Sequence, residues 1–413
     1  MTTLAQRLLR LEPLELSRLS APDAPACLLN LRSFLVRERT LLEHAAAVAE
    51  SLRVEPPPPT ECADESAQAP WWSAMPAAYV AALFQHVAVP REAACANRRG
   101  RLPIFARQSA VLAREALRGM GVPFAHREHA VALIAAQDRP FSLTAGGAPP
   151  ETMLRLSCTA DLRALYWLVR AGMRVFGDEE RLARLESFAE RAARLDVFGH
   201  PSPPPCEAAD IRDPQRRHRA LNAARYFQLV AGMNEPQWFA ERLRQEQRRP
   251  RGRLHLLIGP AGVGKSSWAE EHLAGTVIVS SDRMREELTG DPADQSQNYL
   301  VFQRCMDRVR EHLHEGRGVT FDATNCSEQL RAMPVQAGRW SGAEIASYFF
   351  DVSPGEAILR GRDRARGVPP DVVRRQFRSL TPPALYEADR HFVVDAEGGA
   401  VLYWPATEGR TEQ

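Results

Sequence analysis

The octapeptide GPAGVGKS, residues 259–266, is the feature that most constrains what this chain can fold into. It fits the pattern G-x-x-x-x-G-K-[ST] at every fixed position. An apolar segment of strand length, RLHLLI (253–258), precedes it, and a segment with a helical pattern, SSWAEEHLA (266–274), follows it. A strand, a glycine-rich turn and a helix in this order form a phosphate-binding loop. An incidental glycine turn before a helix is the alternative, but it would not require the flanking strand.

The residue types in this loop suit a nucleotide. Glycines let successive backbone N–H groups turn toward an anion, and the N-terminus of the following helix adds a favourable dipole. Lys265 is expected along the β- and γ-phosphates, and Ser266 on Mg²⁺. Of the 53 lysine and arginine residues, Lys265 is the only lysine, at a place where a forked guanidinium does not fit. The predicted nucleotide-binding residues are Gly259, Gly262, Val263, Gly264, Lys265, Ser266 and Ser267.

The pattern of apolar residues changes along the chain and predicts two domains. Helical apolar spacing in residues 1–200 predicts an all-α domain, with helices over 28–52, 107–120, 126–137, 161–176 and 179–195. Residues 201–252 combine proline-rich and helical segments and are interpreted as a linker. From 253 to 413, strand-length apolar runs alternate with helices, which predicts an α/β domain with a parallel sheet flanked by helices on both faces.

Composition excludes several other classes of protein. The net charge of +2 gives no global field for nucleic acid, so such affinity would need a local basic patch. The seven cysteines are dispersed without a C-x-x-C pair, which argues against a disulfide framework and a cysteine-rich zinc site. Neither a signal peptide nor an apolar run of membrane-spanning length is visible. We therefore expect a cytoplasmic protein without a membrane partner.

Polar residues follow two further predicted strands. Asp282 and Arg285 lie in VSSDRMR (279–285), at the carboxyl end of a strand, where open α/β sheets bind their ligands. Asp282 would accept a proton from an attacking hydroxyl, and Arg285 would hold an acceptor phosphate. The alternative makes Asp282 the N-cap of a helix that begins near Met284. FDATN (321–325) offers Asp322 as a carboxylate for Mg²⁺, or merely a polar turn.

An arginine-rich segment, AILRGRDRARGVPPDVVRRQFRSL (357–380), follows the sheet's fourth predicted strand. In a fold of this order the segment would form a lid over the phosphates. Arg360 and Arg364 are four residues apart and would share one helical face, from which both could stabilise charge on the transferred phosphoryl group. The alternative is a solvated helix face, which is the commoner use of a charge run.

Together these motifs carry a resemblance to a known family. GPAGVGKSS, VSSDRMR, GDPADQS, VTFDATN and RGRDRARGVPPDVVRRQ resemble, in order and spacing, the kinase module of bacterial and phage polynucleotide 5′-hydroxyl kinases, over residues 253 to about 395. The resemblance implies transfer of the γ-phosphate of ATP or another NTP, with Mg²⁺, to a 5′-OH end of RNA or DNA in nucleic-acid repair. It implies that Lys265 and Ser266 bind the NTP and Mg²⁺, Asp282 is the general base, Arg285 contacts the acceptor, and Arg360 with Arg364 forms the lid. Gly361 departs from the asparagine expected after the first lid arginine.

Within the N-terminal domain, LPIFARQSAVLAREALRGMGVPFAHREHAVALIAAQDRPFSL (102–143) resembles the HD phosphohydrolase fold that precedes such a kinase in HD-containing polynucleotide kinases. An active HD site needs histidine and aspartate ligands on several helices, so that a metal activates water. The expected positions hold other residues, which predicts a catalytically dead, degenerate HD-like domain; they are Gln85 and His86, Arg107, Gln137 and Gly172. His126, His129 and His86 are expected to be ordinary core or helix residues.

Two rival functions stay open at this stage. A small-molecule P-loop kinase shares the phosphate loop and the strand-end aspartate, and a nucleotide-binding switch module without phosphotransfer shares the loop alone. The basic lid and the Asp282 and Arg285 pair favour a polymer end and a reaction. For the degenerate domain we expect a role as a scaffold, an RNA-binding platform, or a surface for a homodimer or a partner in a repair complex.

Overall fold

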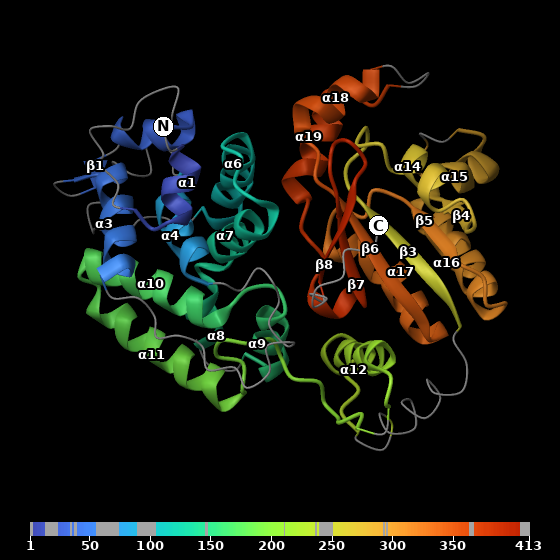
Figure 1. Cartoon of the computed structure of the whole chain (residues 1–413), viewed down its shortest axis with the longest axis horizontal. Coiled ribbons are helices and arrows are strands. Elements are labelled where there is room, and N and C mark those ends of the chain that lie inside the picture. Colours follow the sequence, from blue (N-terminus) through green and yellow to red (C-terminus); the bar gives the residue numbers. More distant parts are fainter. Residues whose placement is uncertain are drawn as a thin grey trace. The chain divides into compact units, whose positions relative to one another are not determined.

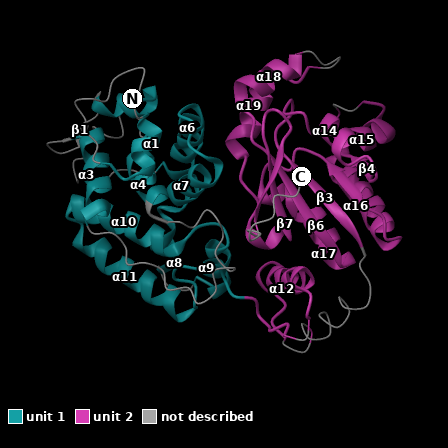
Figure 2. Cartoon of the chain, in the orientation of Figure 1, with its two compact units in different colours: residues 1–203 teal, residues 204–413 magenta. Residues whose placement is uncertain are grey.

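The computed structural model divides into two compact units, residues 1–203 and 204–413 (Figure 1, Figure 2). It describes residues 3–12, 24–33, 35–36, 39–54, 74–88, 105–144, 148–209, 211–235, 238, 251–291, 294, 296–362 and 367–404. Each unit has its own core and is treated separately below. No helix within these described ranges is long and apolar enough to cross a membrane.

The first unit is helical, as its apolar spacing predicts. Two caps show how the sequence sets the helix ends: Asp161 accepts hydrogen bonds from the first turn of α10, and Gly177 ends that helix in the left-handed conformation. The helices are α1 (Leu4–Leu9), α2 (Ala26–Leu29), α3 (Leu41–Val54), α4 (Ala74–Phe84), α6 (Ala106–Gly119), α7 (Phe124–Ala136), α8 (Arg139–Thr144), α9 (Pro150–Ser157), α10 (Leu162–Phe176) and α11 (Glu179–Arg194).

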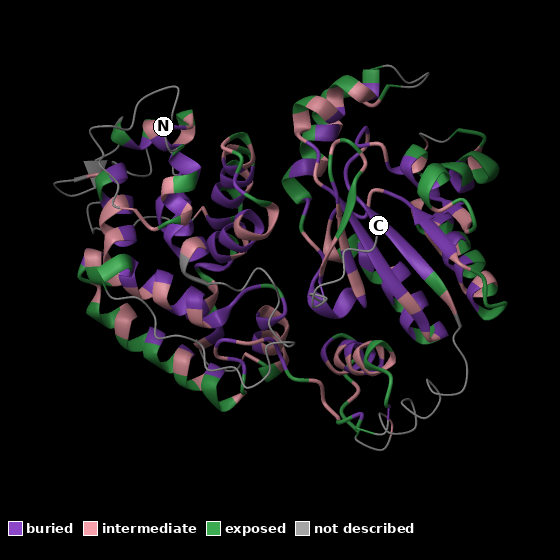
Figure 3. Cartoon of the chain, in the orientation of Figure 1, coloured by how far each residue is buried: buried purple, intermediate pink, exposed green. Residues whose placement is uncertain are grey.

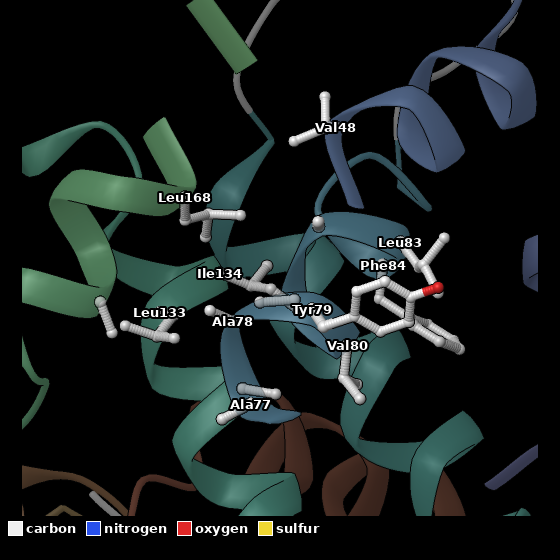
Figure 4. Close-up of a cluster of buried hydrophobic side chains, with 14 of the residues drawn as sticks. Val48, Ala77, Ala78, Tyr79, Val80, Leu83, Phe84, Leu133, Ile134 and Leu168 are labelled. Atoms are coloured by element: carbon white, nitrogen blue, oxygen red, sulfur yellow. The ribbon is translucent and has the colours of Figure 1, made fainter. Parts of the chain in front are cut away.

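Helix α4 lies at the centre of this unit. All residues from Ala77 to Phe84 are buried, and a helix that is apolar on every side needs neighbours all round. Helices α3, α7 and α10 supply them, and Figure 4 shows Val48, Ile134 and Leu168 from these three helices around the α4 side chains. A cluster of charged side chains between α6 and α7 is also buried. In it, Arg114 and Arg127 both pair with Glu128. Despite burial, these two guanidinium groups hold the pKa of Glu128 below its ordinary value.

The helix expected over residues 28–52 is wrong in its first half. The chain instead forms α2, a 3₁₀ turn (Asn30–Ser33) and two short antiparallel strands, β1 (Leu35–Val36) and β2 (Arg39–Thr40), before α3 begins at Leu41. Thr40 and Glu43 explain the start of α3, because each side chain bonds the other's backbone N–H, as in a capping box. Apolar spacing alone did not show that the helix is interrupted before Leu41.

The second unit contains a six-stranded sheet in the order β4-β5-β3-β6-β7-β8. The first five strands in this order pair in parallel, which confirms the predicted α/β domain, but β8 pairs antiparallel with β7 at the edge. The strands are β3 (Arg251–Ile258), β4 (Val277–Ser280), β5 (Val319–Asp322), β6 (Ala343–Phe350), β7 (Arg390–Val394) and β8 (Ala400–Trp404). The helices are α12 (Pro214–Leu229), α14 (Lys265–His272), α15 (Ser281–Thr289), α16 (Asn298–His314), α17 (Glu328–Ser341), α18 (Pro354–Arg362) and α19 (Pro370–Ser379), with a 3₁₀ turn at Leu385–Glu387.

The sheet's central strands are buried beneath helices. Helices α16 and α17 pack on β3, and Figure 3 shows these strands almost wholly buried. Gly338 of α17 is why the helix can approach, because a Cβ there would lie 2.9 Å from side-chain atoms of Leu254 and Ile345. The continuous apolar character of β3, β5 and β6 thus reflects burial on two faces.

Within the segment 201–252, interpreted from the sequence as a linker, α12 packs on the rest of the second unit. The buried Asn222 donates from Nδ2 to the carbonyl oxygens of Leu385 (3.0 Å) and Ala388 (2.6 Å). Phe227 of the same helix packs edge-on against Trp340 of α17. Helical spacing predicted this helix, but only tertiary packing shows that it belongs to the α/β unit.

Two buried ion pairs join α17 to the segment that leads into β7. Arg331 pairs with Glu387 at 2.8 Å, and Arg339 pairs with Asp389 at 2.5 Å, with all four side chains at most 3% exposed. Arg331 also donates to the carbonyl oxygens of Asn325 and Thr381. The guanidinium of Arg331 therefore ties the end of the β5 segment to the chain that follows α19.

Candidate active site

The phosphate loop connects β3 to α14 at the carboxyl end of the central strand. Gly262 and Gly264 have φ values of +86° and +99°, which a side chain would strain. At Gly262 space is lacking too, because a Cβ would lie 2.1 Å from the carbonyl oxygen of Ala357 in α18. The glycine spacing of the motif is thus required by backbone conformation and by close packing of α18.

Lys265 is the first residue of α14, and its side chain bonds back to the first residues of the loop. Its Nζ donates to the carbonyl oxygens of Gly259 (2.8 Å) and Pro260 (2.9 Å), and the residue is only 7% exposed. A compact ammonium can fit against two neighbouring carbonyls, whereas a planar guanidinium presents a wider fork. This contact accounts for the lysine in a chain that otherwise uses arginine.

Ser266 and Asp322 come together although 56 residues separate them. Asp322 ends β5, which lies beside β3, and its Oδ2 accepts a hydrogen bond of 2.7 Å from the Ser266 hydroxyl. Mg²⁺ prefers oxygen ligands and takes one or two from protein, with substrate phosphates and water completing the set. The hydroxyl and carboxylate therefore fit a Mg²⁺ ion that arrives with a nucleotide.

The residues after Asp322 support the loop instead of lining it. The carbonyl oxygen of Thr324 accepts from the N–H of Gly259 at 2.9 Å, and Asn325, at φ +48°, donates to the carbonyl oxygen of Leu257 at 2.8 Å. Next to them, burial raises the pKa of the Cys326 thiol to about 11, so this cysteine is neutral at pH 7. Thr324 and Asn325 thus hold β3 and the loop in place.

Asp282 and Arg285 lie at the end of β4, beside the end of β5. Helix α15 begins at Ser281, and Ser280 occupies the N-cap position, so Asp282 does not cap the helix as the alternative proposed. The Asp282 side chain is 76% exposed and accepts from Arg285 Nη1 at 2.8 Å, while the Arg285 side chain is only 10% exposed. The guanidinium thus orients an exposed carboxylate.

Sequence reasoning missed the second partner of Arg285. Arg285 Nη2 donates to Oδ1 of Asn298, at 3.0 Å, in the first turn of α16. Asn298 is 13 residues away and follows a segment with no strand or helix pattern, so no spacing in the sequence indicates the contact. The two oxygens fix the guanidinium from two helices.

Helices α18 and α19 both reach the phosphate loop. Arg360 donates from Nη1 to the carbonyl oxygen of Val263 (3.3 Å) and from Nη2 to Glu356 (2.6 Å) and to the carbonyl oxygen of Ala396 (2.7 Å). In α19, Gln376 accepts from the N–H of Ala261 at 2.8 Å, a contact that the sequence did not predict.

The remaining predicted residues differ in their surroundings. Arg364 falls outside the described residues, so its shared face with Arg360 stays a prediction. Ser267 is exposed in the first turn of α14, and Val263 is buried at the loop's apex. Arg374, Arg375 and Arg378 are exposed on α19.

The positions expected to carry HD ligands lie on mutually packed helices or just beyond their ends in the first unit. Gln137 donates from Nε2 to the carbonyl oxygen of Gln85 at 3.2 Å, and Gly172 is buried on α10, which packs on α4 and α7. His86 lies 5.7 Å from the ring of His44, and burial lowers its pKa to about 3. In the described part of the chain, no group of three or more His, Cys, Asp or Glu side chains could hold a metal.

Arg107 and His126 lie apart from the fully buried positions. Arg107 is exposed in the first turn of α6, and His126 is only half-buried in α7, whereas His129 is 1% exposed. The HD-like fold of the first unit stays a prediction.

Two comparisons with known proteins found matches for this chain. Residues 254–383 match a family model described as an AAA domain. Among solved structures, the chain is similar to one described as a gluconokinase from Sinorhizobium meliloti 1021, with 18% identity, a TM-score of 0.27, and coverage of 36% of this chain and 85% of that one. The family match spans the phosphate loop and most of the mostly parallel sheet, and this match, the sheet and the loop geometry are those of a P-loop domain in the second unit.

Proposed function

We propose that this protein is an ATP- and Mg²⁺-dependent kinase that transfers the γ-phosphate to the 5′-hydroxyl end of RNA or DNA. The observation that carries the proposal is a continuous path of contacts from the phosphate loop to an exposed carboxylate. Ser266 bonds Asp322, the carbonyl oxygen of Asp322 lies 3.4 Å from the Ser281 hydroxyl, and the next residue is Asp282. A nucleotide-binding switch module needs the pair of Ser266 and Asp322, but it does not need the exposed carboxylate of Asp282.

The chemistry assigns a role to each part of the path. The acceptor's 5′ oxygen attacks the γ-phosphorus, the bond to the β,γ-bridging oxygen breaks, and the nucleoside diphosphate leaves. Asp282 takes the proton of the attacking hydroxyl, and Arg285 with Asn298 holds that carboxylate in place. Mg²⁺ near Ser266 and Asp322 would neutralise charge on the phosphates. Lys265 and Arg360 supply positive charge beside the loop.

Exposed arginines favour a polymer over a small acceptor. Arg374, Arg375 and Arg378 project from α19, the helix that Gln376 attaches to the phosphate loop. Cations next to the transfer site can contact the phosphates of a chain beyond its first nucleotide, and such contacts weaken with salt. A small-molecule acceptor would leave these arginines without a ligand.

Incubation with γ-labelled ATP, Mg²⁺ and 5′-OH RNA or DNA oligonucleotides tests the proposal. We expect label at the 5′ end, and kcat for Asp282→Asn should fall about 10²- to 10⁴-fold, because the general base is lost. Asp307→Asn is the matched control, since Asp307 is an exposed carboxylate (63%) that also pairs with an arginine three residues away. Label on neither polymer refutes the polynucleotide acceptor, and transfer to a free sugar instead supports the small-molecule kinase.

For the first unit we propose a degenerate HD-like domain without phosphohydrolase activity, serving as a scaffold or a surface for nucleic acid or a second copy. The buried glutamines at positions 85 and 137, in place of ligands, support this proposal. Oligonucleotides that end in a 3′-phosphate or a 2′,3′-cyclic phosphate provide the test. Phosphate release by the full-length protein would contradict the proposal.

A further inference from the structure

The first turn of α16, which also carries Asn298, exposes an aromatic side chain. Tyr299 is 73% exposed, the highest value among the large apolar side chains that the structure describes as exposed. It directly follows Asn298, whose side chain holds Arg285, which in turn holds Asp282. Tyr299 is therefore one residue along the chain from the side chain that holds Arg285.

The ring of Tyr299 is also held in orientation. One helical turn later, Gln303 donates from Nε2 to the Tyr299 hydroxyl at 2.8 Å. Two leucines on the packed helices α15 and α16 are exposed as well, Leu288 (37%) and Leu300 (38%). A fixed aromatic face costs less conformational entropy on binding a planar ligand than a freely rotating one does.

We propose that Tyr299 stacks on the nucleobase of the acceptor's 5′-terminal nucleotide. This inference rests on the proposed function and names the part of the acceptor that is recognised. Every nucleobase offers a planar face, so stacking on an exposed aromatic ring accepts many sequences. The terminal base would lie on the ring while its 5′-hydroxyl meets Asp282, so Tyr299 acts as a specificity residue and takes no part in proton transfer.

Two acceptors separate stacking from other roles of Tyr299. One is a 5′-OH oligonucleotide with an ordinary terminal nucleotide, and the other has an abasic residue at the same end. For the ordinary acceptor we expect Tyr299→Ala to raise KM about 5- to 150-fold, the range expected from losing one stacked base. Its kcat and its KM for ATP should stay near the wild-type values. With the abasic acceptor, the wild type and Tyr299→Ala should have similar KM values.

Two further variants control the experiment. Tyr299→Phe keeps the ring and loses the hydroxyl, so it should stay within a few-fold of the wild-type KM. Val401→Ala changes another exposed apolar residue (65%), on β8, and should leave both acceptors unaffected. An equal rise in KM for both acceptors would show that Tyr299 shapes the helix instead of stacking, and no rise for either would also refute the inference.

Binding without turnover distinguishes this failure from failure of the proposed function. Fluorescence anisotropy of a 3′-labelled 5′-OH oligonucleotide reports affinity for the full-length protein in the presence of a non-hydrolysable ATP analogue. If the wild type binds the ordinary oligonucleotide more tightly than the abasic one, and Tyr299→Ala removes the difference, stacking holds even where no phosphate is transferred. If wild-type labelling is normal and the anisotropy is the same for both acceptors, the stacking inference is refuted and the proposed function is still supported.

Discussion

Gly262→Ala is expected to damage the phosphate loop through two separable effects. The first is backbone strain, because an L-residue near φ +86° costs about 1–2 kcal/mol. The second is a collision, because the new Cβ would lie 2.1 Å from the carbonyl oxygen of Ala357. The loop and α18 would have to separate by about 1 Å, and overpacking of this kind costs about 1–3 kcal/mol. Together the two effects should lower the free energy of unfolding of the second unit by about 2–5 kcal/mol.

Two other glycines separate strain from collision. Gly264 has a φ of +99°, but the nearest atom to its Cβ position is a flexible Arg360 nitrogen at 3.7 Å, so Gly264→Ala should show about 1–2 kcal/mol of strain alone. Gly361 has no atom within 4 Å of its Cβ position and lies in helix α18. Gly361→Ala should therefore be neutral or stabilise the unit by up to about 1 kcal/mol.

Urea denaturation of the three variants, with and without MgATP, measures these differences. Wild type should gain stability from MgATP by mass action, and Gly262→Ala should lose most of that gain because the loop is displaced. If Gly262→Ala unfolds at the same urea concentration as Gly264→Ala, α18 does not press on the loop and the reasoning is refuted.

Three further predictions concern the second unit. Arg331→Met should lower the free energy of unfolding by about 3–5 kcal/mol, because it leaves Glu387 charged and unpaired in the core, and adding Glu387→Gln should restore part of the loss in a denaturant titration. Burial lowers the pKa of His391 to about 3 and of His255 to about 4, so their stabilising contribution is complete above pH 6.5 and is lost as pH falls toward those values. Each should cost about 1.4 kcal/mol per pH unit in that range, which urea midpoints between pH 7 and 4 would reveal; a flat profile would contradict it. Gln376→Ala should raise KM for ATP several-fold with little change in kcat, because α19 then no longer holds a loop amide, and an unchanged KM would contradict this role.

Local chemistry in the sequence was enough to predict the phosphate loop. The loop is contiguous, so glycine spacing, a lysine and a hydroxyl define it without reference to the rest of the chain. Asp322 and Asp282 were also predictable, because the ends of neighbouring parallel strands share one edge of a sheet. The alternation of strands and helices predicted the α/β unit, because the apolar pattern of each strand and helix lies in consecutive residues.

Contacts between distant segments could not be predicted in this way. The loop is held by Arg360 and Gln376, which are 97 and 115 residues from their partners, and α12 is attached by Asn222, 163 residues from Leu385. Which polar side chain reaches which backbone group depends on how helices pack, and packing depends on the whole core.

The sequence by itself therefore determined which residues form the phosphate loop, because such a loop is made from neighbours in the chain. Only the tertiary structure decided that Arg285 is held between Asp282 and Asn298, and that Tyr299 is exposed. The physical reason is that this contact joins two helices whose side chains come together only when both helices pack on the sheet.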